Sequence, residues 1–245
     1  EVALARAYRD LDGFPVNARG QRRVTSVLLE ELLEGPEVSV ETVSFAGTAH
    51  VVGVTDKSIG GAPAFVETGH MFPARLAPGQ AEAAADTALA ALKGLGLDQV
   101  VAHTEIKLTP DGPRVVEVNP RPAGNRITEL VRHVTGIDLA AACVDVALGR
   151  APELGPRATG VDSAAIGFLL PEEEGVLEGF DGAEALEECP GVLEVQFAKA
   201  GTAVRPADSN NTYLGHVMAA DPEGGAARER VEALLSAVGP RVARR

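Results

Sequence analysis

Residues 103–121 read HTEIKLTPDGPRVVEVNPR, and this stretch decides the fold. Two segments in which polar and apolar residues alternate flank the turn sequence Pro110–Pro113, which contains an Asp-Gly pair. Alternation with a period of two places successive side chains on opposite faces of a strand. The stretch therefore predicts an antiparallel β-hairpin with one polar face and one apolar face.

The polar faces of the two strands must meet, because directly opposed residues in an antiparallel pair lie on the same face. This condition places Glu105 opposite Glu117 or one step from it. Two opposed carboxylates need either solvent or a cation between them, and ligands that are all oxygen suit Mg²⁺ or Mn²⁺. Asn119 would add a neutral oxygen ligand, and Arg121 would supply a positive charge that clamps a phosphate or carboxylate. From the periodicity alone, a merely solvated charged face is an equal alternative.

The spacing between Glu105 and Glu117, followed by Val-Asn-Pro-Arg-Pro-Ala-Gly over residues 118–124, resembles the metal-binding signature of ATP-grasp enzymes. The resemblance implies that Glu105, Glu117 and Asn119 hold Mg²⁺ beneath the phosphates of ATP. It also implies a catalytic role for Arg121. Two cofactors are therefore expected, ATP and Mg²⁺ or Mn²⁺.

A second match lies upstream, where residues 27–41 read VLLEELLEGPEVSVE. This segment is similar to the linker between the two lobes of ATP-grasp enzymes that grip the nucleotide. By resemblance, backbone groups of Glu31 and Leu33 would read the adenine edge, and Glu30 would lie against the amino group. Glu37 would bind the ribose hydroxyls. The alternative is an acidic strand edge that follows a Gly-Pro turn.

Three shorter matches concern catalysis and the substrate pocket. Lys57, at the end of Val-Thr-Asp-Lys, is at a place where many carboxylate-amine ligases bring a basic residue to the phosphates. Glu67 and His70 resemble a segment that lines the amino-acid pocket of dipeptide-forming members. Asn125 occupies a position where some amino-acid ligases have a bulky pocket residue, and Arg126 would add charge to the same pocket. The alternatives are a solvated lysine, a histidine that caps a turn and an asparagine that caps a helix.

The expected fold class is α+β. An antiparallel sheet with flanking helices, as in the C-terminal lobe of ATP-grasp enzymes, is followed by a small α+β C-terminal domain. Residues 1–152 are expected to form a partial ATP-grasp domain with the adenine linker and the metal-binding lobe, and residues 153–245 the second domain, because 150–160 is rich in Pro and Gly. Periodicity predicts helices at 2–11, 78–94, 126–135 and 139–148, and strands at 24–29, 37–45, 50–55, 100–108 and 114–119.

Composition excludes several classes of function. The chain has 245 residues and a net charge of −13, so it offers no basic stripe for nucleic acid or an anionic membrane surface. No apolar run approaches the roughly 18 residues that span a bilayer. The two cysteines indicate neither a disulfide scaffold nor a zinc module, which fits a cytoplasmic location. Cys189 and His216 are interpreted as packing positions.

The resemblance implies an ATP-dependent carboxylate-amine ligase that activates a carboxylate as an acyl phosphate and forms an amide or peptide bond. Its expected partners are a small-molecule carboxylate and an amine, most simply amino acids, and a homodimer is left open. The chain begins at Glu1 and lacks the Gly-rich loop expected before the adenine linker, so an upstream segment is expected. Two alternatives stay open: an ATP-dependent carboxylase of the same superfamily and a non-catalytic, truncated scaffold module.

Overall fold

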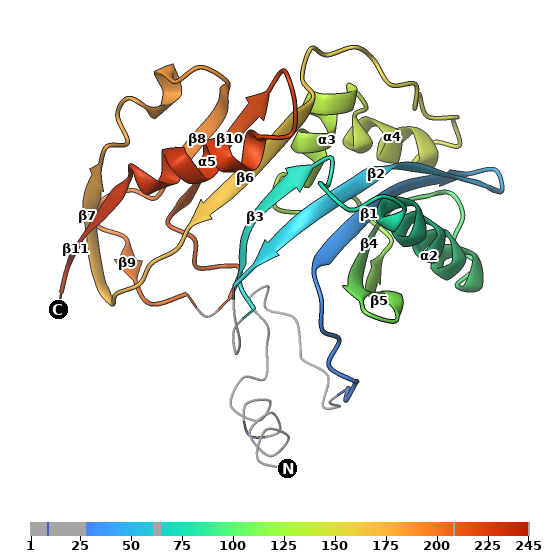
Figure 1. Cartoon of the computed structure of the whole chain (residues 1–245), viewed down its shortest axis with the longest axis horizontal. Helices are drawn as coiled ribbons and strands as arrows, with labels where there is room; N and C mark the ends of the chain where they lie inside the picture. The colour runs from blue at the N-terminus through green and yellow to red at the C-terminus, as the bar shows by residue number, and fades with distance from the viewer. Residues whose placement is uncertain (1–8, 10–27, 61–64, 208, 245) are drawn as a thin grey trace. The chain divides into compact units, whose positions relative to one another are not determined.

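The computed structural model describes residues 9, 28–60, 65–207 and 209–244. The chain divides into two compact units, residues 1–33 and 34–245. The second unit contains the sheets and helices that position the candidate site (Figure 1).

An eight-stranded sheet forms the centre of the second unit, with the strand order β5-β4-β1-β2-β3-β6-β10-β8. Every neighbouring pair in this order is antiparallel. The strands, in chain order, are β1 (Glu37–Phe45), β2 (Thr48–Ile59), β3 (Glu67–Phe72), β4 (Val100–Thr109), β5 (Gly112–Asn119), β6 (Ser163–Leu169), β8 (Val192–Phe197) and β10 (Gly215–Asp221).

A three-stranded sheet in the order β11-β7-β9 stands beside the large one in the C-terminal part of the chain (Figure 1). Its strands are β7 (Gly175–Asp181), β9 (Ala203–Val204) and β11 (Gly239–Ala243). The helices that the structure describes from end to end are α2 (Gln80–Gly94), α3 (Ile127–Thr135), α4 (Leu139–Ala147) and α5 (Ala227–Ser236), together with the 3₁₀ turn η1 (Leu186–Glu188).

Helices cover both faces of the large sheet. The Val38 and Val40 side chains of β1 pack against α2 together with Ile106 of β4, and α5 covers Met71 and neighbouring residues on the same face. On the opposite face, α3 and α4 pack over one end of the sheet, around Val43 and other buried residues. The other end of that face carries the polar side chains of the candidate site. The expected α+β class, with an antiparallel sheet and flanking helices, is confirmed.

The predicted helices and strands are confirmed in part. The strand at 37–45 and the helix at 78–94 are confirmed, and β4 and β5 form the predicted hairpin. The strand predicted at 50–55 is longer, since β2 runs over 48–59. The strand predicted at 24–29 is wrong in its described part, because Leu28 and Leu29 have no regular secondary structure. Residues 24–27, and residues 2–8, 10 and 11 of the predicted N-terminal helix, lie outside the described residues.

The apolar face expected for the edge strand β5 is more exposed than its sequence pattern predicts. Val115 and Val116 are 38% and 43% exposed, so this strand is not half-buried as its sequence pattern predicts. The connection that contains the predicted domain boundary at 152/153 joins α4 to β6. Strands from both sides of that boundary share the large sheet, because β3 pairs with β6. Independent behaviour of residues 153–245 stays a prediction.

Among the described residues, the longest helices are too short or too polar to cross a membrane.

Candidate functional site

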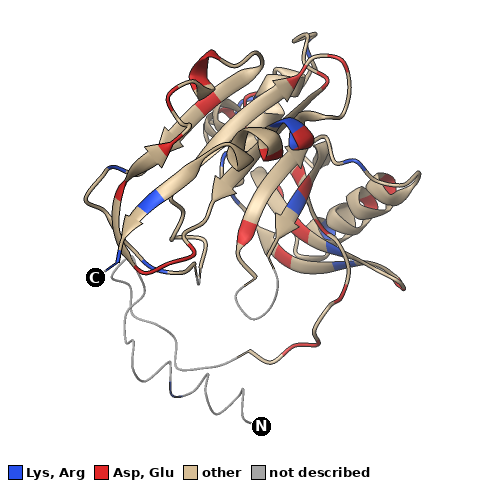
Figure 2. Cartoon of the chain, turned by 60° about the vertical axis from the view of Figure 1, so that its left-hand side comes forward, with Lys and Arg blue, Asp and Glu red and all other residues tan. Residues whose placement is uncertain are grey.

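Polar side chains line one face of the strands at the centre of the large sheet. In β1, Glu37, Ser39 and Glu41 alternate with Val38 and Val40, which face α2. Successive side chains of a strand point to opposite faces, so the three polar residues share the face that α2 does not cover. Figure 2 shows acidic and basic positions close together along strands of the chain.

Lys57 of β2 lies at the centre of this polar face. Its Nζ is 2.9 Å from Glu37 Oε1, 3.0 Å from Glu67 Oε1 and 2.6 Å from Glu105 Oε1. The side chain is only 2% exposed, so three carboxylates compensate one nearly buried ammonium. Burial by itself would lower the pKa of Lys57, but the negative charges of Glu105 and Glu67 raise it above its ordinary value. Lys57 is therefore held in its charged form.

A second buried ion cluster lies next to Lys57 and was not predicted. His103 Nδ1 is 3.0 Å from Glu41 Oε1, and His103 Nε2 is 3.3 Å from Glu105 Oε1. Ser39 Oγ donates a hydrogen bond of 2.8 Å to Glu41 Oε1. Burial opposes protonation of His103, but the hydrogen bonds and charges of Glu105 and Glu41 raise its pKa to about 9. The signal in the sequence was the parity that His103 shares with Glu105 and that Glu41 shares with Glu37.

The hairpin has the predicted register. Glu105 of β4 lies directly opposite Glu117 of β5, and His103 lies opposite Asn119. Asn119 Nδ2 donates a hydrogen bond of 3.1 Å to Glu117 Oε2, which leaves the Asn119 amide oxygen to face another group. Arg121, two residues beyond β5, is exposed and donates from Nη1 to the Pro122 carbonyl at 2.9 Å.

The donor chemistry of this hairpin suits a hard divalent cation, because two carboxylates and an amide oxygen meet on adjacent strands. Within the described residues, no group of three or more His, Cys, Asp or Glu side chains is arranged to hold a metal ion. Here Glu105 instead contacts Lys57 and His103. The hydrogen bond from His103, acting against burial and reinforced by Lys57, lowers the pKa of Glu105 to about 2, so the carboxylate is ionised and able to serve as a ligand.

The predicted substrate residues Glu67, His70 and Asn125 come together in the structure. Asn125 Nδ2 donates a hydrogen bond to Glu67 Oε2, and His70 Nε2 lies 3.5 Å from the same oxygen. Burial would raise the pKa of Glu67, but His70 and Lys57 lower it to about 2. The nearby Tyr213 hydroxyl is buried, and burial together with the charge of Glu67 raises its pKa above the ordinary value. This part of the site combines a permanent negative charge with a neutral phenol.

Arg126, the fourth predicted substrate residue, belongs to an adjoining cluster. Its Nη2 is 2.5 Å from Glu194 Oε1 and its Nη1 is 3.3 Å from Glu129 Oε1. The same Glu194 oxygen is 3.1 Å from His216 Nε2. The interpretation of His216 as a packing position therefore needs correction, because its ring pairs with a carboxylate. Glu194 was missed because β8 is far from Arg126 in the sequence.

A strained turn delivers Asn125 and Arg126 to these two clusters. Both residues have positive φ angles, 46° and 65°, although neither is glycine. Such backbone conformations cost on the order of 1–3 kcal/mol each and persist where the surroundings impose them. The turn ends at the first residue of α3, and its two side chains contact Glu67 on one side and Glu194 on the other.

The remaining predicted nucleotide contacts are not tested by the geometry. Glu30, Glu31 and Leu33 lie in the first unit, residues 1–33, so their contacts with adenine stay a prediction. Glu37 lies in the second unit and pairs with Lys57 and, at 3.1 Å, with Lys107 Nζ. Its role at the ribose also stays a prediction.

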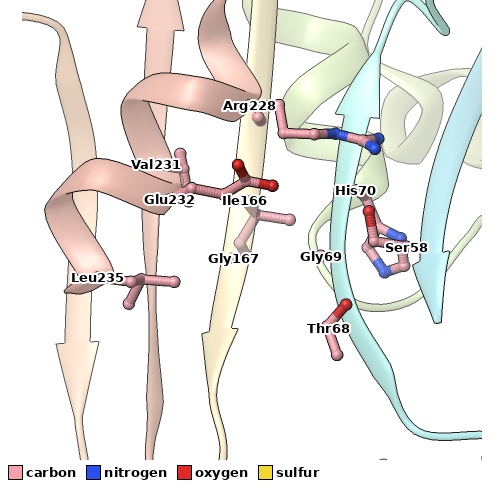
Figure 3. A pocket seen from close by; sticks show the side chains of 11 residues that line it. Ser58, Thr68, Gly69, His70, Ile166, Gly167, Arg228, Val231, Glu232 and Leu235 are labelled. Carbon is pink, nitrogen blue, oxygen red and sulfur yellow. The ribbon is translucent and has the colours of Figure 1, made fainter. Parts of the chain in front are cut away.

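A small cavity lies on the other face of the sheet, and His70 is among the residues that line it. It has a volume of about 130 Å³ and is bounded by α5, β2, β3 and β6 (Figure 3). Its floor contains Gly69 and Gly167, which are directly opposed across β3 and β6. A Cβ at Gly69 would lie 2.6 Å from the Ile166 carbonyl oxygen, and one at Gly167 would lie 2.6 Å from Val231 and Leu235 side-chain atoms. The two glycines therefore permit close packing of β3, β6 and α5.

Comparison with known families identifies the fold. Residues 7–129, half of the chain, match the family described as the ATP-grasp domain. The chain belongs to the ATP-grasp family. Residues 167–243 of this ATP-grasp chain match the family described as L-amino acid ligase C-terminal domain 2. The family that the metal-binding signature predicted is thus confirmed, and the second match covers the strands that carry Glu194 and His216.

Two relatives of this ATP-grasp chain are longer proteins, and each matches the chain over part of its own length. An uncharacterized protein of Sinorhizobium fredii is 30% identical over 221 residues, which are 89% of this chain and 44% of that protein. Carnosine synthase 1 of Homo sapiens is 38% identical over 137 residues, which are 55% of this chain and 17% of that enzyme. The chain therefore spans less than half the length of these curated relatives.

A solved structure shows the same relationship. The crystal structure of L-amino acid ligase from Bacillus licheniformis matches with a TM-score of 0.75 at 25% sequence identity. The match covers 86% of this ATP-grasp chain and 53% of that ligase.

Proposed function

We propose that this chain is part of a Mg-ATP-dependent ligase that joins the carboxylate of one small molecule, most simply an amino acid, to the amine of another. The observation that carries the proposal is the direct opposition of Glu105 and Glu117 beside Asn119. The ligases among its relatives, carnosine synthase and L-amino acid ligase, support the same reaction class. The match over 167–243 favours amino-acid ligation over an ATP-dependent carboxylase.

The residues of the polar face would have different roles in binding the metal and the phosphates. Glu105, Glu117 and Asn119 would hold Mg²⁺, which neutralises charge on the phosphates of ATP when bound. Arg121 forms no ion pair in the described part of the chain, so its guanidinium is available for a phosphate or carboxylate oxygen. Lys57 is placed by its carboxylate partners next to Glu105 and supports the same charge-neutralising role.

The reaction proceeds in two transfers. A substrate carboxylate oxygen attacks the γ-phosphorus of ATP, the bond to ADP breaks, and an acyl phosphate forms. The amine nitrogen then attacks the acyl carbon, phosphate leaves, and the nitrogen loses a proton to give the amide. The protein contributes positioning and charge stabilisation to both transfers, so its site needs carboxylates, Arg and Lys but no covalent nucleophile.

Glu67, His70, Asn125 and Arg126 would bind the amino-acid substrate. Glu67 stays ionised over the physiological pH range, so it suits the ammonium group of an amino acid. Glu30, Glu31 and Leu33 would bind adenine, and Glu37 the ribose. These assignments, the cytoplasmic location and the 152/153 domain boundary are parts of the proposal that rest on the sequence.

The test is ADP formation by the protein with Mg-ATP and pairs of amino acids. Glu117→Gln should abolish ADP formation while the far-ultraviolet circular dichroism stays unchanged, because Glu117 lies on an exposed part of β5. Glu178→Gln, the same change at an exposed position of β7, is the matched control and should keep full activity. Undiminished turnover in Glu117→Gln would contradict the metal assignment. ADP formation that requires bicarbonate instead of an amino acid would refute the ligase proposal.

Nucleotide binding gives a second readout that does not depend on turnover. Isothermal titration with Mg-ADP should show binding that Glu105→Ala removes. A folded protein that binds no nucleotide would favour the scaffold alternative.

A further inference from the structure

A line of side chains extends the site across the sheet to residues that have no assigned role. His70 of β3, Phe168 of β6 and His216 of β10 occupy one face, since His216 is directly opposite Phe168 and their rings are in edge contact at 6.3 Å. The His70 and Phe168 ring centroids are 5.6 Å apart, and Tyr213 stacks on Phe168 at 4.3 Å. Glu194 follows His216 on this line at 3.1 Å. Side-chain contacts therefore connect the proposed amino-acid site to Glu194.

Two observations indicate that this line faces a ligand. His70 is almost fully buried; its Nε2 lies 3.5 Å from Glu67 Oε2, and its Nδ1 has no hydrogen-bond partner within the described residues. A buried polar group without a partner costs free energy, which a ligand can recover by pairing with it. The strained turn at Asn125 and Arg126 also contacts both ends of the line. It places one side chain on Glu67 and the next on Glu194.

At the Glu194 end of the line, two carboxylates share one guanidinium. Arg126 is the cation that pairs with Glu194, and it pairs with Glu129 as well. His133 of α3 lies near both Arg132 and Glu194, and burial together with the charge of Arg132 lowers its pKa. Arg132 is thus a further cation at this end of the line, besides the Arg126 guanidinium that the two carboxylates share.

We propose that Glu194 is a specificity-determining residue, which selects amino-acid substrates with a neutral or cationic side chain and rejects those that carry a second carboxylate. This inference rests on the proposed amino-acid ligase function and names the substrate class of the same site. Arg126 and His216 position the Glu194 carboxylate, and 31% of the Glu194 side chain is exposed. A carboxylate brought next to Glu194 would meet like charge, and such juxtaposition is an effective means of rejecting a wrong ligand.

The experiment compares substrates that differ in side-chain charge. The protein and its Glu194→Gln variant are assayed for ADP formation with lysine, leucine and glutamate as the varied amino acid. In Glu194→Gln, kcat/KM for glutamate relative to leucine should rise about tenfold or more, mainly through KM, whereas that for lysine should fall. This magnitude is that of one charge pair near a protein surface. Glu194→Asp should restore the preference of the natural protein.

Glu187→Gln is the matched control, because it removes one exposed carboxylate just before β8 and should leave all substrate ratios unchanged. A glutamate-to-leucine ratio in Glu194→Gln within twofold of the natural value, with leucine still used, would overturn the inference and leave the ligase function standing.

Amino-acid binding measured by titration without ATP separates the two proposals further. If the protein forms no ADP with any amino acid, the ligase function fails, and the specificity of Glu194 is still tested by whether Glu194→Gln strengthens glutamate binding about tenfold relative to lysine. Folded protein that binds no amino acid at all would overturn the role of Glu194.

Discussion

Replacement of Lys57 by Met should destabilise the fold more than any other single change on the polar face. The ammonium contacts Glu37, Glu67 and Glu105 at 2.6–3.0 Å, and its side chain is 2% exposed. Lys57→Met keeps the length of the side chain and removes its charge. Three carboxylates, each at most 20% exposed on its side chain, then lose their shared counter-charge.

The magnitude follows from what remains near each carboxylate. Removal of one partner from a buried ion pair typically costs about 3–5 kcal/mol. Lys107 still contacts Glu37 at 3.1 Å and His103 still contacts Glu105 at 3.3 Å, which offsets part of the loss. We therefore expect the free energy of unfolding to fall by about 3 kcal/mol, at the lower end of that range.

Urea denaturation at pH 7, followed by circular dichroism, measures this change. Lys107→Met is the matched control, because Lys107 pairs with the single carboxylate of Glu37 and is 19% exposed on its side chain. It should lose about 1 kcal/mol or less. Equal losses in the two variants, or a loss below about 1 kcal/mol in Lys57→Met, would refute the view that Lys57 holds the polar face together.

The pH dependence of stability and one core substitution give three further predictions. His103 has a pKa raised from 6.5 to about 9, so its stabilising contribution is complete below pH 6.5 and is lost as the pH rises through 9; His103→Gln should flatten this part of a stability-pH curve. Glu67 and Glu105 have pKa values lowered from 4.5 to about 2, so their contribution is complete above pH 4.5 and is lost as the pH falls through 2, which urea unfolding between pH 5 and 2 would show as a steady decline. Ile106→Ala, at a fully buried position, should lower the free energy of unfolding by about 2–5 kcal/mol in the same assay. Val115→Ala, at a 38% exposed position, should lower it far less. Equal losses in the two variants would contradict the packing of α2 on the sheet.

The hairpin could be predicted because its rule is local. Polar residues had to oppose polar residues across a turn of known position, which placed Glu105 opposite Glu117, as the structure has it. The same parity rule, applied to Glu37, Ser39 and Glu41 of β1, would have found the partners of Lys57 and His103. No sequence motif marks Glu41 or His103, so the sequence gives no local reason to select these two residues.

The rest of the site depends on contacts between distant segments. β3 pairs with β6 across more than 90 residues of chain, and no local pattern specifies that pairing. Glu194 and Arg126 come together only because β8 and β10 join the far side of the same sheet. β3 itself was missed as a strand, since its six residues contain Gly and two charged or titratable side chains with little alternation.

The pairing of β3 with β6 limits where this chain can be cut into separately folding parts. We call this pair of strands the seam. Gly69 and Gly167 face each other at the seam, and a side chain on either would collide with backbone or with α5. The close contacts of Gly167 are with α5 of the same C-terminal segment, whereas Gly69 approaches the Ile166 carbonyl oxygen across the 152/153 boundary, so a side chain at position 69 would disturb the pairing of the two segments. A chain that stopped at residue 152 would present the open backbone of β3 to other molecules, and unpaired strand edges of this kind promote aggregation. The two family segments thus share one sheet, because β3 of the first segment and β6 pair through their backbones.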